Sequence, residues 1–117
     1  MSKEMEQMAP PKYKVYVAGP YTIGDPAINT RTMIFACDKI LDEGFIPFCP
    51  LLTHLWHIVS PKAYDVWTEY NNAWVVACDC LLRIPGESKG ADAEVALALS
   101  LDMPVFYNIQ EMKEYYE

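Results

Sequence analysis

Short apolar runs alternate with longer amphipathic segments along most of this chain. Runs rich in β-branched and aromatic residues predict strands at residues 13–18, 45–49, 79–84 and 105–107. Apolar residues recurring at helical spacing predict helices at 28–43, 64–77, 93–101 and 109–117. Asn29 or Thr30 is the expected N-cap of the first helix, and Gly44 is its expected stop. Residues 50–61, bounded by two prolines, are expected to be irregular.

The alternation of strands and helices favours parallel strand pairing with right-handed crossovers. The expected fold is α/β: a small doubly wound (Rossmann/flavodoxin-like) parallel sheet of about four to five strands with helices on both faces. Residues 13–117 are expected to form a single domain, because 117 residues are too few for two. Residues 1–12 are expected to be a mobile tail. Pro47 in the second strand favours a place at the edge of the sheet or the start of a strand.

Residues 81–94 are the stretch around which the rest of the chain is organised. They run from an apolar strand through a loop with two glycines into a helix, and ligands of open α/β sheets bind at such strand ends. Backbone N–H groups and the hydroxyl of Ser88 favour an anion there. Glu94 is expected in the first helical turn, where the dipole would depress its pKa and suit it as a nucleophile. The alternative is that Ser88 and Glu94 only cap and charge a helix start.

The loop that follows the first strand lies next to this stretch if the sheet is doubly wound. It lacks both G-x-G-x-x-G and the P-loop pattern, which argues against the two commonest kinds of nucleotide-binding site in such a fold. Tyr16 on the first strand belongs either to the core or to the ligand site. Polar residues that could bond a ribose hydroxyl, or simply face solvent, cluster in the 64–77 helix: Asp65, Glu69, Asn71 and Asn72.

Two histidines lie in the stretch expected to be irregular. His54 and His57 are three residues apart, but H-E-x-x-H is missing, so we expect no metal. They are expected to line a base pocket or to stack with Trp56. No cofactor is expected either.

Charge and composition narrow the partners. The formal net charge of −7 argues against a nucleic-acid polymer, because binding the phosphate backbone needs a basic face. A small phosphorylated ligand stays open, with Arg31 and Lys89 as the nearest cations. No apolar run approaches the ~20 residues of a membrane span, so no membrane partner is expected. Four cysteines without C-x-x-C spacing are expected to be reduced, buried thiols in a cytoplasmic protein.

Three motifs occur in order: Val-Tyr-Val-Ala-Gly-Pro-Tyr at 15–21, Thr-Glu-Tyr-Asn-Asn at 68–72 and Gly-Glu-Ser-Lys-Gly-Ala-Asp-Ala-Glu at 86–94. Together they resemble the nucleoside 2-deoxyribosyltransferase superfamily, which includes the 2′-deoxynucleoside 5′-phosphate N-hydrolases. The resemblance extends over residues 14–107. It implies a doubly wound fold, an active site at a subunit interface, and cleavage of an N-glycosidic bond through a covalent deoxyribosyl-glutamate. Water or a second base then resolves that intermediate.

The resemblance also implies roles for particular residues. Glu94 matches the nucleophile, Tyr16 the tyrosine that orients it, and Ser88 the serine that contacts the 5′-phosphate in the hydrolase branch. Further substrate or phosphate contacts are expected at Gly19, Tyr21, His54, Asp65 and Gly90.

Two positions depart from the family pattern. Asn71 stands where the family has the aspartate that protonates the leaving base, and an amide cannot deliver a proton. Asp65 or Glu69 could take that role instead. Pro20 and Thr22 stand where the hydrolase branch has a phosphate-binding serine and arginine.

The expected function is an N-glycosidase of (deoxy)nucleoside 5′-monophosphates that acts by hydrolysis or by transfer to another base. Its expected partner is a small nucleoside or nucleotide. Aromatic residues make up 13% of the chain and favour a homodimer or higher homo-oligomer, because so small a domain buries few of them fully. The alternatives are a non-catalytic nucleotide-binding protein and an assembly protein that uses Trp56, Trp67 and Trp74.

Overall fold

The computed structural model describes residues 12–117, so nearly all of the expected tail lies outside the described residues. Within them, the chain forms one four-stranded sheet of order β2-β1-β3-β4, in which every pair is parallel. The strands are β1 (Lys14–Ala18), β2 (Ile46–Phe48), β3 (Cys80–Arg83) and β4 (Val105–Phe106). The sequence prediction of all four strands is confirmed, as is the edge position of β2.

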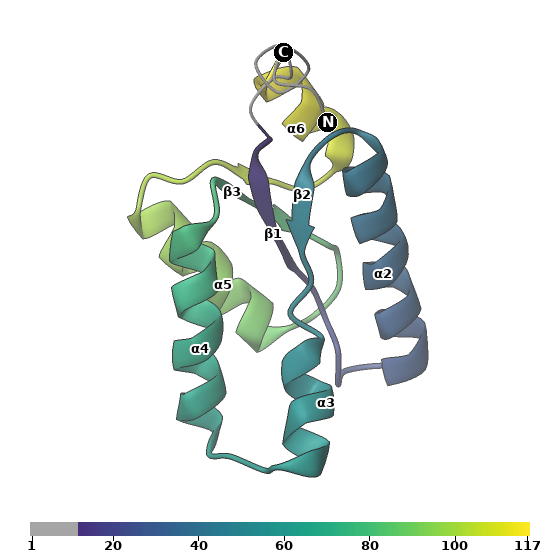
Figure 1. Cartoon of the computed structure of the whole chain (residues 1–117), viewed down its shortest axis with the longest axis vertical. Helices are drawn as coiled ribbons and strands as arrows, with labels where there is room; N and C mark the ends of the chain where they lie inside the picture. The colour runs from purple at the N-terminus through teal and green to yellow at the C-terminus, as the bar shows by residue number, and fades with distance from the viewer. Residues whose placement is uncertain (1–11) are drawn as a thin grey trace, which may run out of the picture.

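Helices cover both faces of the sheet, which confirms the small Rossmann-like α/β fold (Figure 1). They are α2 (Pro26–Asp42), α3 (Leu52–Val59), α4 (Tyr64–Ala77), α5 (Lys89–Ser100) and α6 (Ile109–Tyr115). Alternate side chains of the central strand β1 enter opposite cores, as a pleated strand requires. Val15 and Val17 pack with α2 and α6, whereas Tyr16 and Ala18 pack with α4 and α5.

The first helix begins earlier than the sequence analysis predicted. Asp25, not Asn29 or Thr30, is the N-cap, and its carboxylate accepts from the backbone N–H groups of Ala27 and Ile28. Pro26 follows at the first helical position, where a missing N–H costs nothing. Asn29 instead donates its side-chain amide to two carbonyls of the preceding loop, at 2.8 Å each.

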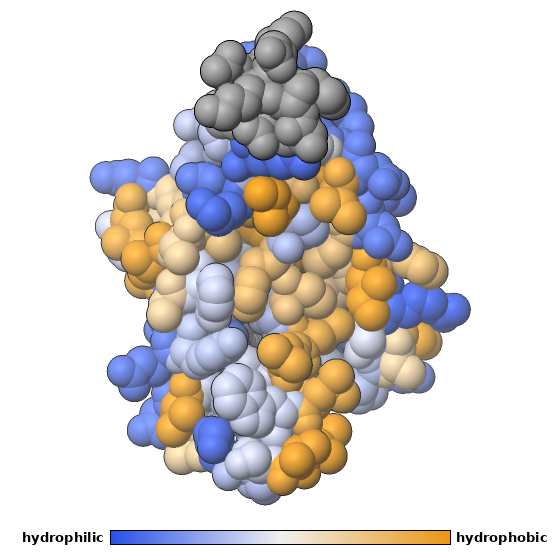
Figure 2. All heavy atoms as spheres, viewed as in Figure 1, coloured by the Kyte–Doolittle hydropathy of each residue, from blue (hydrophilic) through white to orange (hydrophobic). Residues whose placement is uncertain are grey.

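The prediction that residues 50–61 are irregular was wrong, because they contain α3. The two prolines flank this helix rather than interrupt it. Leu52, Leu55 and Val59 recur at helical spacing, so the sequence did carry a signal for this helix. Leu52, Leu55 and Val59 are exposed, and Figure 2 shows apolar side chains gathered over α3 at the lower right.

All four cysteines are free thiols, as expected, but only two of them are buried. Cys78 and Cys80 lie in the core, whereas Cys37 and Cys49 are half-buried. Among the described helices, none is both long and apolar enough to cross a membrane.

Candidate active site

A buried phenol and a half-buried carboxyl meet between β1 and α5. The Tyr16 side chain is fully buried, and its hydroxyl donates to Oε2 of Glu94 at 2.6 Å. Tyr16 comes from the central strand and Glu94 from the helix that crosses it. The connection from β3 to α5 thus brings Glu94 next to Tyr16, although the two residues are far apart in the sequence.

Glu94 lies further along its helix than the sequence analysis predicted. Because α5 begins at Lys89, with Ser88 as its N-cap, Glu94 lies in the second turn, and Asp92 is the acid of the first turn. The expected influence of the helix N-terminus on Glu94 was therefore overestimated, since it falls off within the first turn.

Burial decides the ionisation of this pair. It raises the pKa of Glu94 to about 7, although the Tyr16 hydrogen bond and the positive charge of Arg83 both act to lower it. The prediction of a depressed pKa was therefore wrong: desolvation outweighs the favourable partners. Burial, with the nearby Glu94 charge, raises the pKa of Tyr16 far above its usual value, so Tyr16 remains a neutral donor.

A cavity of about 710 Å³ lies beside Glu94, between the two loops, α3 and α4. Seven of the residues expected in the site line it: Gly19, Tyr21, His54, Asn71, Ser88, Gly90 and Glu94. Tyr16 reaches the site through Glu94. Asp65 and Glu69 on α4 are exposed and do not line the cavity. Arg31 on α2 and Lys89 on α5 are likewise exposed and do not line it.

The two loops pack directly against each other at the point where the strand order reverses. A Cβ on Gly86 would lie 2.8 Å from Cγ of Pro20, and Gly86 has a φ of +124°. A Cβ on Gly19 would lie 3.0 Å from Cβ of Ile84. Gly86 therefore needs glycine, whereas a side chain at Gly19 would require Ile84 to shift, and the prediction that these loops are neighbours is confirmed.

Ser88 has the capping role that the simpler interpretation gave it. Its Oγ accepts from the N–H of Ala91 at 3.1 Å. Ser88 also lines the cavity, together with Gly90, whose missing side chain leaves open space. The first turn of α5 thus presents a hydroxyl and backbone to the cavity, which suits an anion.

The histidines form part of an aromatic wall. His54 stacks on Tyr21 with ring centroids 3.6 Å apart and planes 8° apart, rather than on Trp56. Burial and the neighbouring His57 lower the pKa of His54, so it is neutral at pH 7. The residues the structure describes contain no group of three or more potential metal ligands.

His57 is oriented by two donors. Its Nδ1 accepts from Nε1 of Trp67 at 2.9 Å and from the N–H of Lys62 at 3.1 Å. In the neutral ring the proton is therefore on Nε2, which can donate to a ligand.

Asn71 carries a polar atom without a partner. Its Oδ1 is buried and accepts no hydrogen bond from any described residue. Such an atom in a native structure calls for an explanation, and a binding site is one.

Sequence reasoning missed Arg83. It ends an apolar strand, and its side chain is 9% exposed, yet it forms an ion pair with Asp92 at 2.8 Å. The signal was a cation inside a run otherwise suited to a buried strand, since a buried cation requires a partner.

Together these features define a small Rossmann-like α/β protein with a carboxyl–phenol pair beside a cavity at the switch point. The chain belongs to the family described as a domain of unknown function, DUF4406, whose model matches residues 13–107. No curated protein matches it.

Proposed function

We propose that this protein cleaves the N-glycosidic bond of (deoxy)nucleoside 5′-monophosphates, with Glu94 as the nucleophile. The observation that carries the proposal is the Glu94 carboxyl, held by Tyr16 at 2.6 Å on the wall of a cavity large enough for such a ligand. The resemblance of three motifs to the deoxyribosyltransferase superfamily supports the choice of substrate. A half-buried, oriented carboxylate suits a reaction that develops positive charge at the sugar carbon.

In the first step, a Glu94 oxygen bonds to C1′ while the bond from C1′ to the base nitrogen breaks. Tyr16 holds Oε2, which leaves Oε1 for the attack. The electron pair leaves with the base, which takes a proton from solvent. In the second step, water or another base attacks C1′ and frees the carboxylate, and water loses a proton as it does so.

The walls of the cavity suggest which part of the ligand lies where. Ser88 and Gly90 at the start of α5 suit the phosphate. The stacked rings of Tyr21 and His54 suit a planar base.

The leaving base receives less help than in the family pattern. Among the described lining residues Glu94 is the only carboxyl, and neither Asp65 nor Glu69 lines the cavity. Asn71, and the Nε2 proton of His57, can offer hydrogen bonds to the base. We therefore propose that the base departs hydrogen-bonded rather than protonated by a carboxylic acid.

Base release from a panel of nucleoside monophosphates, followed by chromatography, tests the proposal. Acid-quenched protein should carry a sugar-phosphate adduct on the Glu94 peptide in mass spectrometry. Added free base separates hydrolysis from transfer. Glu94→Gln should form neither product nor adduct, whereas Glu69→Gln, the same change at an exposed site on α4, should retain both.

A second candidate is a nucleotide-binding protein without catalysis, which Asn71 in place of an acid favours. Nucleotides would then raise the melting temperature while no base is released.

A further inference from the structure

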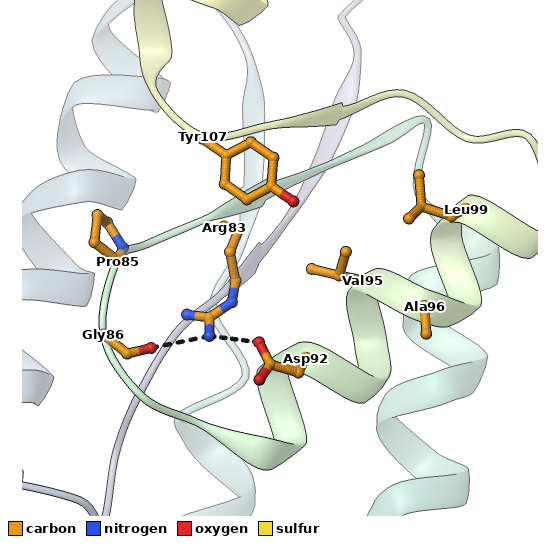
Figure 3. A pocket seen from close by; sticks show the side chains of 8 residues that line it. All are labelled: Arg83, Pro85, Gly86, Asp92, Val95, Ala96, Leu99 and Tyr107. Atoms are coloured by element: carbon orange, nitrogen blue, oxygen red, sulfur yellow. Dashed lines mark hydrogen bonds and ion pairs between the residues drawn. The ribbon is translucent and has the colours of Figure 1, made fainter.

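Arg83 connects three parts of the chain that must come together to present Glu94. From the end of β3, its guanidinium donates to the carbonyl of Ile84, to the carbonyl of Gly86 at 2.9 Å and to Oδ1 of Asp92 at 2.8 Å. Figure 3 shows the guanidinium between the β3–α5 loop and the first turn of α5. One side chain thus ties the strand, the loop and the helix.

The loop between β3 and α5 has an uncommon backbone conformation that these hydrogen bonds stabilise. Gly86 has a left-handed φ of +124°, and its Cα faces the Pro20 ring closely. The carbonyl that Arg83 binds belongs to that same glycine. A planar guanidinium can bind a carbonyl and a carboxylate at the same time, which an ammonium group does less well.

We propose that Arg83 is a positioning residue for Glu94, and that Asp92 determines how much of the Arg83 charge reaches the Glu94 carboxyl. The inference rests on the proposed function only for its consequences in catalysis. The structural reason is that α5 starts from the loop that Arg83 holds, and Glu94 follows Asp92 on that helix.

Electrostatics supports the same assignment. Positive charge on Arg83 lowers the pKa of Glu94 against the effect of burial. The Asp92 side chain is 70% exposed and opposes that charge from the solvent side. Tyr16 from β1 meets Glu94 directly. The other groups line the cavity: uncharged Thr68, Asn71 and Asn72 from α4, and the titratable Tyr21, His54, His57, Lys62 and Tyr64. Of all these, only Tyr16 joins Arg83 in acting on the pKa of Glu94.

The two members of the ion pair should therefore have opposite effects. Arg83→Gln removes the positive charge and should raise the pKa of Glu94 above its wild-type value. Asp92→Asn frees the guanidinium from its counter-charge and should lower that pKa. Arg83→Lys keeps the positive charge but loses the planar guanidinium, so the pKa of Glu94 in this variant should lie between those in wild type and Arg83→Gln. Lys39→Gln, which removes an exposed charge on α2, is the matched control and should change nothing.

The measurement is the titration of the Glu94 carboxyl by NMR of protein labelled at the glutamate side-chain carboxyl carbons. Glu94→Gln identifies the signal. The pH profile of base release, measured on the same variants, should shift on its acidic side in parallel with the NMR titration.

Opposite shifts for Arg83→Gln and Asp92→Asn support the inference. An unchanged Glu94 titration in both, or shifts in the same direction, overturns it and leaves Arg83 a purely structural residue. If Arg83→Gln does not fold, Asp92→Asn decides alone, because Asp92 is exposed: a lowered pKa supports the inference and an unchanged one overturns it. If the wild type releases no base, the proposed function fails, and the NMR titration still decides the role of Arg83.

Discussion

Glu94→Gln should abolish base release and, above neutral pH, make the protein more stable. The reason is that the folded chain withdraws much of this carboxyl from water, which penalises its charged form. Glutamine is neutral at every pH, has nearly the same shape, and its carbonyl can still accept from Tyr16. A residue that the fold tolerates at a cost in stability is what a catalytic group is expected to be.

The magnitude follows from the two pKa values. In the unfolded chain the pKa of Glu94 has its ordinary value of 4.5, and in the folded protein it is about 7. The difference, about 2.5 pH units at 1.36 kcal/mol each, amounts to about 3 kcal/mol. Since the folded-state pKa is the higher one, the penalty is absent below pH 4.5 and grows as the pH rises to 7. It is fully present above that.

Urea unfolding of wild type and variant at pH 4.5 and at pH 8 measures this difference. Glu94→Gln should gain up to about 3 kcal/mol of unfolding free energy at pH 8 and less than about 1 kcal/mol at pH 4.5. Glu69→Gln on the exposed side of α4 is the control and should show no such pH dependence. An equal effect of Glu94→Gln at both pH values would refute the reasoning, because the carboxyl would then not be desolvated in the native state.

Three further predictions address neighbouring residues and assembly. Tyr16→Phe keeps the ring but removes the donor, so the pKa of Glu94 should rise above 7 and the acidic limb of the pH–rate profile should shift upward. A profile identical to that of wild type would contradict the role of Tyr16. Asn71→Asp should raise the rate of base release, by up to ~10²–10⁴-fold if the acid is well placed. The buried oxygen at this position has no donor among the described residues, which favours a protonated acid; an unchanged rate would show that the base leaves without help from α4. Light scattering at micromolar concentration should give a homodimer or larger, because Leu52, Leu55 and Val59 leave an apolar face on α3. A monomer would count against it.

The fold was readable from the sequence because its strongest signals are local. The run from Val15 to Ala18 is apolar on both faces, as the central strand of a parallel sheet must be, and all four of its residues are buried. The helix from Tyr64 to Ala77 was predicted to the residue. The start of the first helix was predicted wrongly because two signals competed there. Asp25 followed by Pro26 begins the helix, whereas Asn29 had been the expected N-cap.

The composition of the site was readable, but its electrostatics was not. The resemblance of three motifs to a known family brought Tyr16, Glu94 and Asn71 into one hypothesis, and Glu94 does meet Tyr16 beside a cavity that Asn71 lines. The direction of the Glu94 pKa depends on how completely α5 covers β1, which no spacing in the sequence reveals. Arg83 was missed for the same reason, since its partners are the carbonyls of a loop whose shape only the folded chain defines.

The cavity draws its walls from two separate parts of the chain. The carboxyl–phenol pair rests on β1 and α5, whereas α3 and α4 supply His54, Trp67 and the amides of Asn71 and Asn72 to the cavity wall. Changes within residues 51–72 can therefore alter which ligand is accepted without disturbing the pair that would react with it. In a lineage of such proteins, substrate range and reaction chemistry are then free to diverge at different rates.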